Sequence, residues 1–305
     1  MSRIRSAILA SLAADSLSLG AHWEYDQGRI VRLLGRVTDL LPPTLNDYHS
    51  GKGAGDQSHY GDQTLLLLRS VAGRGAFDLT DFATRWRGMM EGGYSGYMDK
   101  ASREALANFA AGRAPEQTGA ATNDFAGAAR MAPLLAVSGP DPKDEEGLVN
   151  AARAQTLMTH GSPVIADGAE FMARAAAALL RGADMRGAFE HAATARYAAL
   201  PAGDWLAFAD MSLNEDTPAA IARFGQSCGM QGAFLGVVHV ALKHEADPET
   251  GLVDNIMAGG DSCARGLAIG MLFGARHGLG WMPERWLAPL AARAEIEAAL
   301  DTLGV

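Results

Sequence analysis

Residues 162–180 read SPVIADGAEFMARAAAALL, and this stretch decides the fold class. A serine followed by a proline is typical of a helix N-terminus, because the first turn does not need the N–H that proline lacks. Apolar residues then recur at intervals of three and four positions, which is the period of one helix face. Gly182 follows where a helix should stop. The pattern predicts a helix over Ala166–Leu180 that begins after Ser162.

The same helical period recurs along the whole chain, whereas alternating five-residue strands and dinucleotide-binding glycine motifs are missing from the sequence. It is clearest in Leu65–Val71, Asp81–Glu91, Glu145–Met158 and Pro283–Leu300. Thr80 and Thr217 are expected N-caps, and Gly225 and Gly278 are expected helix ends. Because this texture does not change along the chain, we expect an all-α fold, a compact multi-helix bundle with residues 1–305 in a single domain.

Composition limits the classes of function. The chain has 305 residues, of which 48% are hydrophobic and 20% charged, and a formal net charge of -9. An acidic balance argues against nucleic acid or an anionic membrane as a partner, but not against a small anionic ligand. The N-terminal apolar stretch is interrupted by Asp15 and by serines, unlike a signal peptide. Cys228 and Cys263 lack redox or zinc spacing. We therefore expect a cytoplasmic protein with reduced thiols.

Two segments lack the helical period. Leu41–Gly61 is polar and glycine-rich, and a loop of this length in a compact domain usually has a function, so it is a candidate to close over a site. It contains Gly-Lys without the spacing of a Walker loop. Ser138–Glu146 is expected to be a surface connection.

The first polar motif is Ala14–Asp26, at the end of the first expected helix. Asp15 lies in an apolar helix and needs hydrogen bonds, because an unpaired buried carboxylate is costly. It is either an acceptor that caps a neighbouring helix or part of a ligand site. Trp23, Glu24 and Tyr25 follow a glycine and together suit an aromatic wall with one carboxylate, a shape that fits a nucleotide-like ligand.

The second motif is His59–Thr64, which precedes the expected helix Leu65–Val71. Acidic and hydroxyl residues at this position are usually caps. The alternative is that Asp62 and Gln63 direct their oxygens at a ligand beyond the helix N-terminus.

Two further motifs lead into helices through small residues, which lets an anionic group approach free backbone N–H groups. They are Thr122–Arg130 and Gly259–Gly266. In the second, Asp261 is either a cap or a site residue. Cys263 in the first helical turn is either a thiol with a lowered pKa or a small buried side chain.

In order and spacing these motifs resemble the ADP-ribosylglycohydrolases over essentially the whole chain. The matching segments are Ala14-Asp15, Gly61-Asp62-Gln63-Thr64, Asn123–Pro133, Thr159-His160-Gly161-Ser162-Pro163, Gly259–Ala264 and Gly274–Trp286. Gly20–Asp26, Tyr60–Thr64 and Ala258–Ser262 further resemble the branch that contains selenoprotein J and the jellyfish J-type crystallins.

The resemblance implies a site where hydroxyls and carboxylates hold a pair of Mg²⁺ ions, and this chain departs from it. Gly61 brings no hydroxyl and Gln63 only a neutral amide, while Cys263 is a soft ligand that does not suit Mg²⁺. Of the implied metal ligands only Asp62 and Asp261 remain carboxylates. We therefore expect a degenerate magnesium site with at most one weakly bound Mg²⁺.

The resemblance also implies a hydrolase that cleaves a glycosidic bond of ADP-ribose or a related nucleotide sugar, with a small-molecule or ADP-ribosylated substrate as partner. Asp62 and Asp261 are the implied catalytic carboxylates, one of them a general base toward water. The candidate ligand-binding residues are Asp15, Trp23, Glu24, Gln63, Asn123, Gly127, His160 and Arg265. Two alternatives stay open: a non-catalytic binder of ADP-ribose or a nucleotide, and a crystallin-like structural protein.

Overall fold

The computed structural model describes residues 2–138 and 144–305, and in these ranges the chain is all-α, as its sequence predicts. The α-helices are α1 Arg3–Ser18, α2 Gln27–Leu34, α3 His59–Arg74, α4 Leu79–Glu91, α5 Lys100–Ala110, α6 Ala126–Ala129, α7 Glu145–Leu157, α8 Pro163–Leu180, α9 Met185–Ala193, α10 Ala202–Asp210, α11 Thr217–Phe224, α12 Met230–Lys243, α13 Pro248–Met257, α14 Ser262–His277, α15 Glu284–Leu287 and α16 Arg293–Thr302. Three 3₁₀ turns are η1 Leu19–Ala21, η2 Pro115–Gln117 and η3 Ala132–Ala136.

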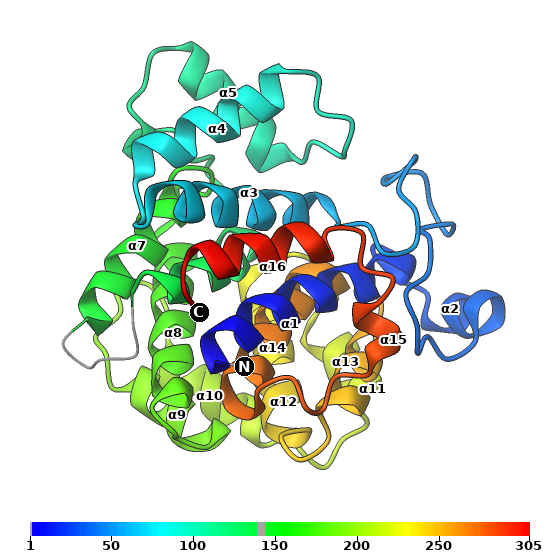
Figure 1. Ribbon diagram of the computed structural model, residues 1–305. Coiled ribbons are helices and arrows are strands. Elements are labelled where there is room, and N and C mark those ends of the chain that lie inside the picture. The colour runs from blue at the N-terminus through cyan, green and yellow to red at the C-terminus, as the bar shows by residue number, and fades with distance from the viewer. Residues whose placement is uncertain (1, 139–143) are drawn as a thin grey trace.

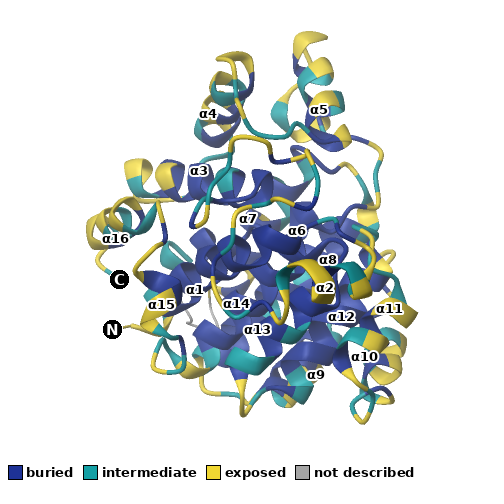
Figure 2. Cartoon of the chain, turned by 90° about the vertical axis from the view of Figure 1, so that its right-hand side faces the viewer, coloured by how far each residue is buried: buried dark blue, intermediate teal, exposed yellow. Residues whose placement is uncertain are grey.

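Helices α1 and α14 form the buried centre of the bundle (Figures 1 and 2). They approach closely because α14 presents a glycine every fourth residue toward α1. A Cβ atom at Gly270 would lie 2.3 Å from the Ala10 carbonyl oxygen, and one at Gly274 would lie 2.5 Å from the Ser6 carbonyl oxygen. Larger residues would therefore push the two helices apart.

By length and composition, the segment Arg3–Ala21 would also qualify as a membrane span, with a mean hydropathy of 1.2. In the structure 89% of this window is buried inside the protein. Helices that form a protein core have the same apolar composition, and here α1 packs along α14.

Other helices pack around this centre, and those at the surface have one face exposed to solvent. Helix α3 lies beside α16, while α4 and α5 extend beyond α3 at one end of the molecule (Figure 1). Figure 2 shows the exposed outer faces of α2, α4, α5 and α16 against the buried interior. One hydrophobic cluster extends from Ala7 in α1 to Leu300 in α16, so the first and last helices share a core.

The expected single helix Pro283–Leu300 was wrong, because the structure has α15 and α16 in its place. The break lies at Pro289, which cannot donate the backbone hydrogen bond that a continuous helix requires. After the break, the Ala291 N–H donates to the Gly55 carbonyl at 2.9 Å and attaches this connection to the loop before α3.

Two expected caps were also wrong by one or two residues. Asp78, not Thr80, caps α4, and Asp216, not Thr217, caps α11, in each case through a carboxylate that accepts backbone N–H groups. The expected helix ends at Gly182, Gly225 and Gly278 are confirmed: these residues have φ of 106°, 113° and 74°. Most of the expected connection 138–146 lies outside the described residues.

Candidate functional site

An aromatic pocket of about 240 Å³ opens where loops from distant parts of the chain meet. Its lining residues are Trp23, Tyr25, Tyr48, Tyr97 and Cys228. An adjoining hollow of about 450 Å³ shares two tyrosines with it and is lined by Asn46, Asp47, Tyr48 and Tyr97. Together the two reach the usual size of a small-molecule site. Two of the three residues expected in an aromatic wall, Trp23 and Tyr25, line the pocket, whereas Glu24 does not, and the loop before α3 supplies Tyr48.

Backbone conformation brings Trp23 to this pocket. Its φ is 60°, in the left-handed region that non-glycine residues rarely adopt. The strain is held by hydrogen bonds from the Trp23 N–H to the Gly260 carbonyl at 2.8 Å and from the Gly260 N–H to the Glu24 carbonyl at 2.7 Å. Strained backbone persists where surrounding contacts enforce it, as in many binding sites.

Asp261 lies at the start of α14 and is fully buried. Neither of its carboxylate oxygens has a hydrogen-bond partner within the described ranges. His22 Nε2 lies 3.7 Å from Oδ1, and the buried Tyr60 hydroxyl, which also has no hydrogen-bond partner in the described chain, is near enough to lower the pKa of Asp261. Burial raises the pKa of Asp261 to about 6, opposed by the positive charge of Arg265. The Asp261 charge in turn helps to raise the pKa of Tyr25 in the pocket wall.

Asp124 is a second buried carboxylate beside the pocket, and the sequence analysis did not select it. Its pKa is raised well above the usual range by burial and then by the charge of Asp261. It is held by the Ala126 N–H, which donates to Oδ1 at 2.9 Å. The Phe125 N–H donates to the Cys228 carbonyl at 2.8 Å, which joins this turn to the pocket lining. The available signal was an aspartate two residues before a helical turn of small residues.

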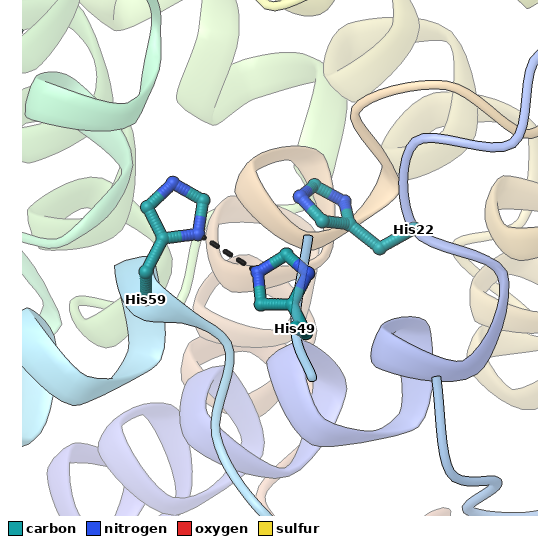
Figure 3. Close-up of side chains that lie close together, drawn as sticks. All are labelled: His22, His49 and His59. Atoms are coloured by element: carbon teal, nitrogen blue, oxygen red, sulfur yellow. Dashed lines mark hydrogen bonds between the residues drawn. The ribbon is translucent and has the colours of Figure 1, made fainter. Parts of the chain in front are cut away.

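His22, His49 and His59 form a buried cluster next to Asp261 (Figure 3). His49 Nε2 and His59 Nδ1 are 3.0 Å apart. Burial lowers the pKa of His49 to about 3 and that of His22 well below its usual value. His22 and His59 belong to the polar motifs and His49 to the irregular loop, but no sequence spacing links the three. On the far side, His59 Nε2 lies 3.6 Å from Asp99 Oδ2.

Asp15 is a structural acceptor, one of its two expected roles. Its carboxylate accepts from the Ser58 N–H at 2.7 Å and from the Ser58 hydroxyl at 2.5 Å. Ser58 is the N-cap of α3, so Asp15 fixes the start of that helix against α1. Burial raises the pKa of Asp15 to about 7, and the Ser58 hydrogen bonds oppose this rise.

Asp62 and Gln63 point to protein partners rather than to Asp261. Lys52 Nζ donates to Asp62 Oδ2 at 2.7 Å, and the Tyr94 hydroxyl donates to the same oxygen. Gln63 Oε1 accepts from Trp86 Nε1 at 2.8 Å and from the Arg130 guanidinium at 3.0 Å. Asp62 Oδ2 and Gln63 Oε1 are thus occupied by donors from the protein.

Glu24 and Arg265 also have structural partners. Glu24 forms an ion pair with Arg29, and its Oε1 accepts from the Asp26 N–H. Arg265 is fully buried and donates to Asn255 Oδ1 at 2.8 Å and to the Gly259 carbonyl at 2.6 Å. Arg265 therefore supports the loop before α14 from inside the protein.

The thiol of Cys263 does not have the lowered pKa considered from its place at a helix N-terminus. Burial raises its pKa well above the usual value, and the charge of Asp15 adds to the rise. The side chain lies 3.5 Å from the Asp15 carbonyl. Cys263 is therefore a small buried residue, because a thiolate would be strongly disfavoured there.

Of the last three candidate ligand-binding residues, Asn123 is at the surface, whereas Gly127 and His160 are buried. Asn123 is exposed, and its carbonyl accepts from the Met230 N–H at 2.7 Å. Gly127 is buried against the ring of His160, where a Cβ atom would lie 2.7 Å from Nδ1. His160 Nδ1 bonds the Thr159 hydroxyl at 2.8 Å, and burial lowers the pKa of His160 to about 3.

Comparison with known proteins agrees with this geometry. The sequence model of the ADP-ribosylglycohydrolase family matches residues 1–304. The chain belongs to this family, as its motifs predict. Crystallin J1A of Tripedalia cystophora is 23% identical over 314 residues, covering 96% of this chain and 94% of the crystallin. An ADP-ribosylglycohydrolase-related protein complex has a similar structure, with a TM-score of 0.75, 25% identity, and coverage of 99% of this chain and 96% of that chain.

The residues at the implied magnesium positions do not fit a pair of Mg²⁺ ions. At Gly61 a Cβ atom would lie 2.1 Å from Asp15 Oδ2, so a hydroxyl side chain has no space there. The Asp62 carboxylate is neutralised by Lys52, and a cation shared with Asp261 would have to displace that ammonium group. Mg²⁺ requires several hard oxygen ligands. Asp62 Oδ2 and Gln63 Oε1 accept from protein donors instead, and a single carboxylate at Asp261 does not make a two-metal site.

Proposed function

We propose that the protein is a glycohydrolase that cleaves a glycosidic bond of ADP-ribose or a related nucleotide sugar. Membership of the ADP-ribosylglycohydrolase family supports the reaction class. The observation that carries the proposal is the Asp261 carboxylate, which is fully buried and has no hydrogen-bond partner on either oxygen among residues 2–138 and 144–305. Burying such a group is costly unless a ligand or a bound water completes its hydrogen bonds, and a carboxylate in this position can accept from either a substrate or the attacking water.

Asp261 and Asp124 supply an acid–base pair. Buried carboxylates that repel each other titrate as a unit, so one ionises while the other retains its proton. Asp261 takes the role of base and removes a proton from the attacking water. We assign the acid role to Asp124, whose pKa is raised by burial and by the charge of Asp261, so that it gives its proton to the leaving group as the glycosidic bond breaks. Asp124 thus replaces Asp62, which the sequence analysis selected and which bonds Lys52.

The aromatic pocket suits the nucleotide part of such a substrate. Trp23 and Tyr97 have ring centroids 4.9 Å apart, and Tyr48 lies 5.0 Å from Trp23. Rings arranged edge to face leave π surfaces and hydroxyls available to a planar base and a ribose. The substrate would place its anomeric carbon toward Asp261, beneath the pocket.

The test is calorimetric titration of ADP-ribose into metal-stripped protein, followed by an assay for release of ADP-ribose from ADP-ribosylated arginine and serine peptides in EDTA. Binding with EDTA-resistant turnover is expected. Asp261→Asn and Asp124→Asn should each reduce kcat by at least about 100-fold. Asp216→Asn is the matched control, because asparagine is an equally good N-cap for α11 and the residue lies outside the pocket lining.

A non-catalytic role is the second candidate, favoured by the occupied Asp62 and Gln63 oxygens and by the similarity to Crystallin J1A. Binding of ADP-ribose without turnover of either peptide would support a binder. Absence of binding with and without millimolar Mg²⁺ would remove ADP-ribose from the proposal and favour a structural protein.

A further inference from the structure

Three histidines from separate segments converge at one buried point. His22 follows η1, His49 lies in the loop before α3, and His59 is the first residue of α3. One ring nitrogen from each lies within 4.8 Å of the other two. Figure 3 shows the three rings facing a common space. We propose that these histidines bind one divalent transition-metal ion of the Zn²⁺ class.

The spacing of the rings suits metal ligation. His49 Nε2 and His59 Nδ1 are 3.0 Å apart. Two nitrogens bound to a tetrahedral Zn²⁺ at about 2.0–2.1 Å are separated by about 3.3 Å, so the rings need almost no movement. The ion would take the place of the proton that these two nitrogens share in a hydrogen bond. The third ring, His22, has an Nε2 atom without a hydrogen-bond partner in the described chain, 3.7 Å from Asp261 Oδ1. A water molecule would complete the tetrahedron as the fourth ligand and donate a hydrogen bond to Asp261 Oδ1, which leaves that carboxylate unligated.

Contacts on the sides of the rings that face away from the proposed ion bear on the orientation of His59 and His22. Asp99 Oδ2 faces His59 Nε2 at 3.6 Å, while Asp99 Oδ1 accepts from the Ser102 N–H at 2.6 Å. Asp99 Oδ2 and His59 Nε2 are not hydrogen-bonded at this distance, and neither has another partner in the described chain. A small shift of the ring toward Asp99 would place the ring proton on Nε2 and leave the Nδ1 lone pair free for a metal. His22 requires one adjustment. Its Nδ1 accepts a long 3.3 Å bond from the Cys263 N–H, which must open when the proton moves to Nδ1.

The surrounding charges are balanced. The nearby positive charges are Lys52, which lowers the pKa of His49, and Arg265, which lowers that of His22. Asp99 and Asp261 provide two carboxylates in return. Neutral imidazoles suit zinc, copper, nickel and iron, whereas Mg²⁺ selects oxygen. The site therefore differs in chemistry from the magnesium pair that the family resemblance implies. The inference does not depend on the proposed hydrolysis, because metal binding is measured directly.

The test is titration of chelator-stripped protein with Co²⁺, monitored by d–d absorption, and with Zn²⁺ in competition with a chromophoric chelator at pH 7.5. We expect one ion per chain and no competition from millimolar Mg²⁺. His49→Ala and His59→Gln should weaken Zn²⁺ binding by at least about 100-fold, and Asp99→Asn by about 10–100-fold.

Two control variants separate this site from other ligands. His239→Gln changes a buried histidine that bonds Ser212 and Thr217 instead, and Cys228→Ser removes the more accessible thiol. Both should retain wild-type affinity and the same Co²⁺ spectrum. Circular dichroism verifies that each variant folds. If His59→Gln does not fold, His49→Ala still tests the site, because His49 lies in a loop. Absence of stoichiometric binding, or unchanged binding in folded His49→Ala, would overturn the proposal, as would loss of binding in Cys228→Ser.

Discussion

The buried carboxyl of Asp15 should make the stability of the protein fall as pH rises. Its pKa is raised from 3.8 to about 7 in the folded state. The folded protein therefore binds more protons than the unfolded chain between these values, and the free energy of unfolding decreases with pH across that window. This decrease in the free energy of unfolding begins above pH 3.8 and levels off above about pH 7. Between pH 5 and 8 it amounts to about 2–3 kcal/mol.

Asp15→Asn isolates this contribution, because the amide keeps the shape of the carboxyl and does not titrate. An asparagine Oδ1 can still accept from the Ser58 N–H. We would measure urea unfolding of both proteins at pH 5, 6, 7 and 8. The wild type should lose about 2–3 kcal/mol relative to the variant over this range. A difference between the two proteins that is constant with pH, or that grows in favour of the wild type, would refute the reasoning.

Three further substitutions test other contacts. Gly127→Ala places a Cβ atom against the His160 ring and should cost about 1–3 kcal/mol in urea unfolding; an unchanged midpoint would contradict the packing. Lys52→Met removes the ammonium from Asp62 and should speed amide exchange in the loop before α3 by about fivefold, whereas exchange in α8 stays the same. Arg265→Met leaves two buried carbonyl acceptors without their donor, and we expect a loss of about 2–4 kcal/mol, seen as a lower Tm.

The sequence determined the helical class, most helix positions and the family, because these depend on patterns among residues that are close together in the chain. Apolar period, proline at a first turn and glycine after a last turn act over a few residues. The same locality explains the small errors. Asp78 and Thr80 are both good caps, and only the backbone geometry decides which oxygen accepts the free N–H groups. Pro283–Leu300 has helical period on both sides of Pro289, which hid the break.

Tertiary structure alone decided which polar residues meet. Asp62 and Asp261 looked equivalent in sequence, yet Lys52 neutralises the first and the second remains without a partner among the described residues. His49 lies in an irregular loop, and nothing in the sequence around it indicates that its ring contacts His59. Hydrogen bonds and charges act over a few ångströms in space, whereas sequence patterns report neighbours along the chain. The chemistry of this site therefore follows from long-range packing that a local pattern does not encode.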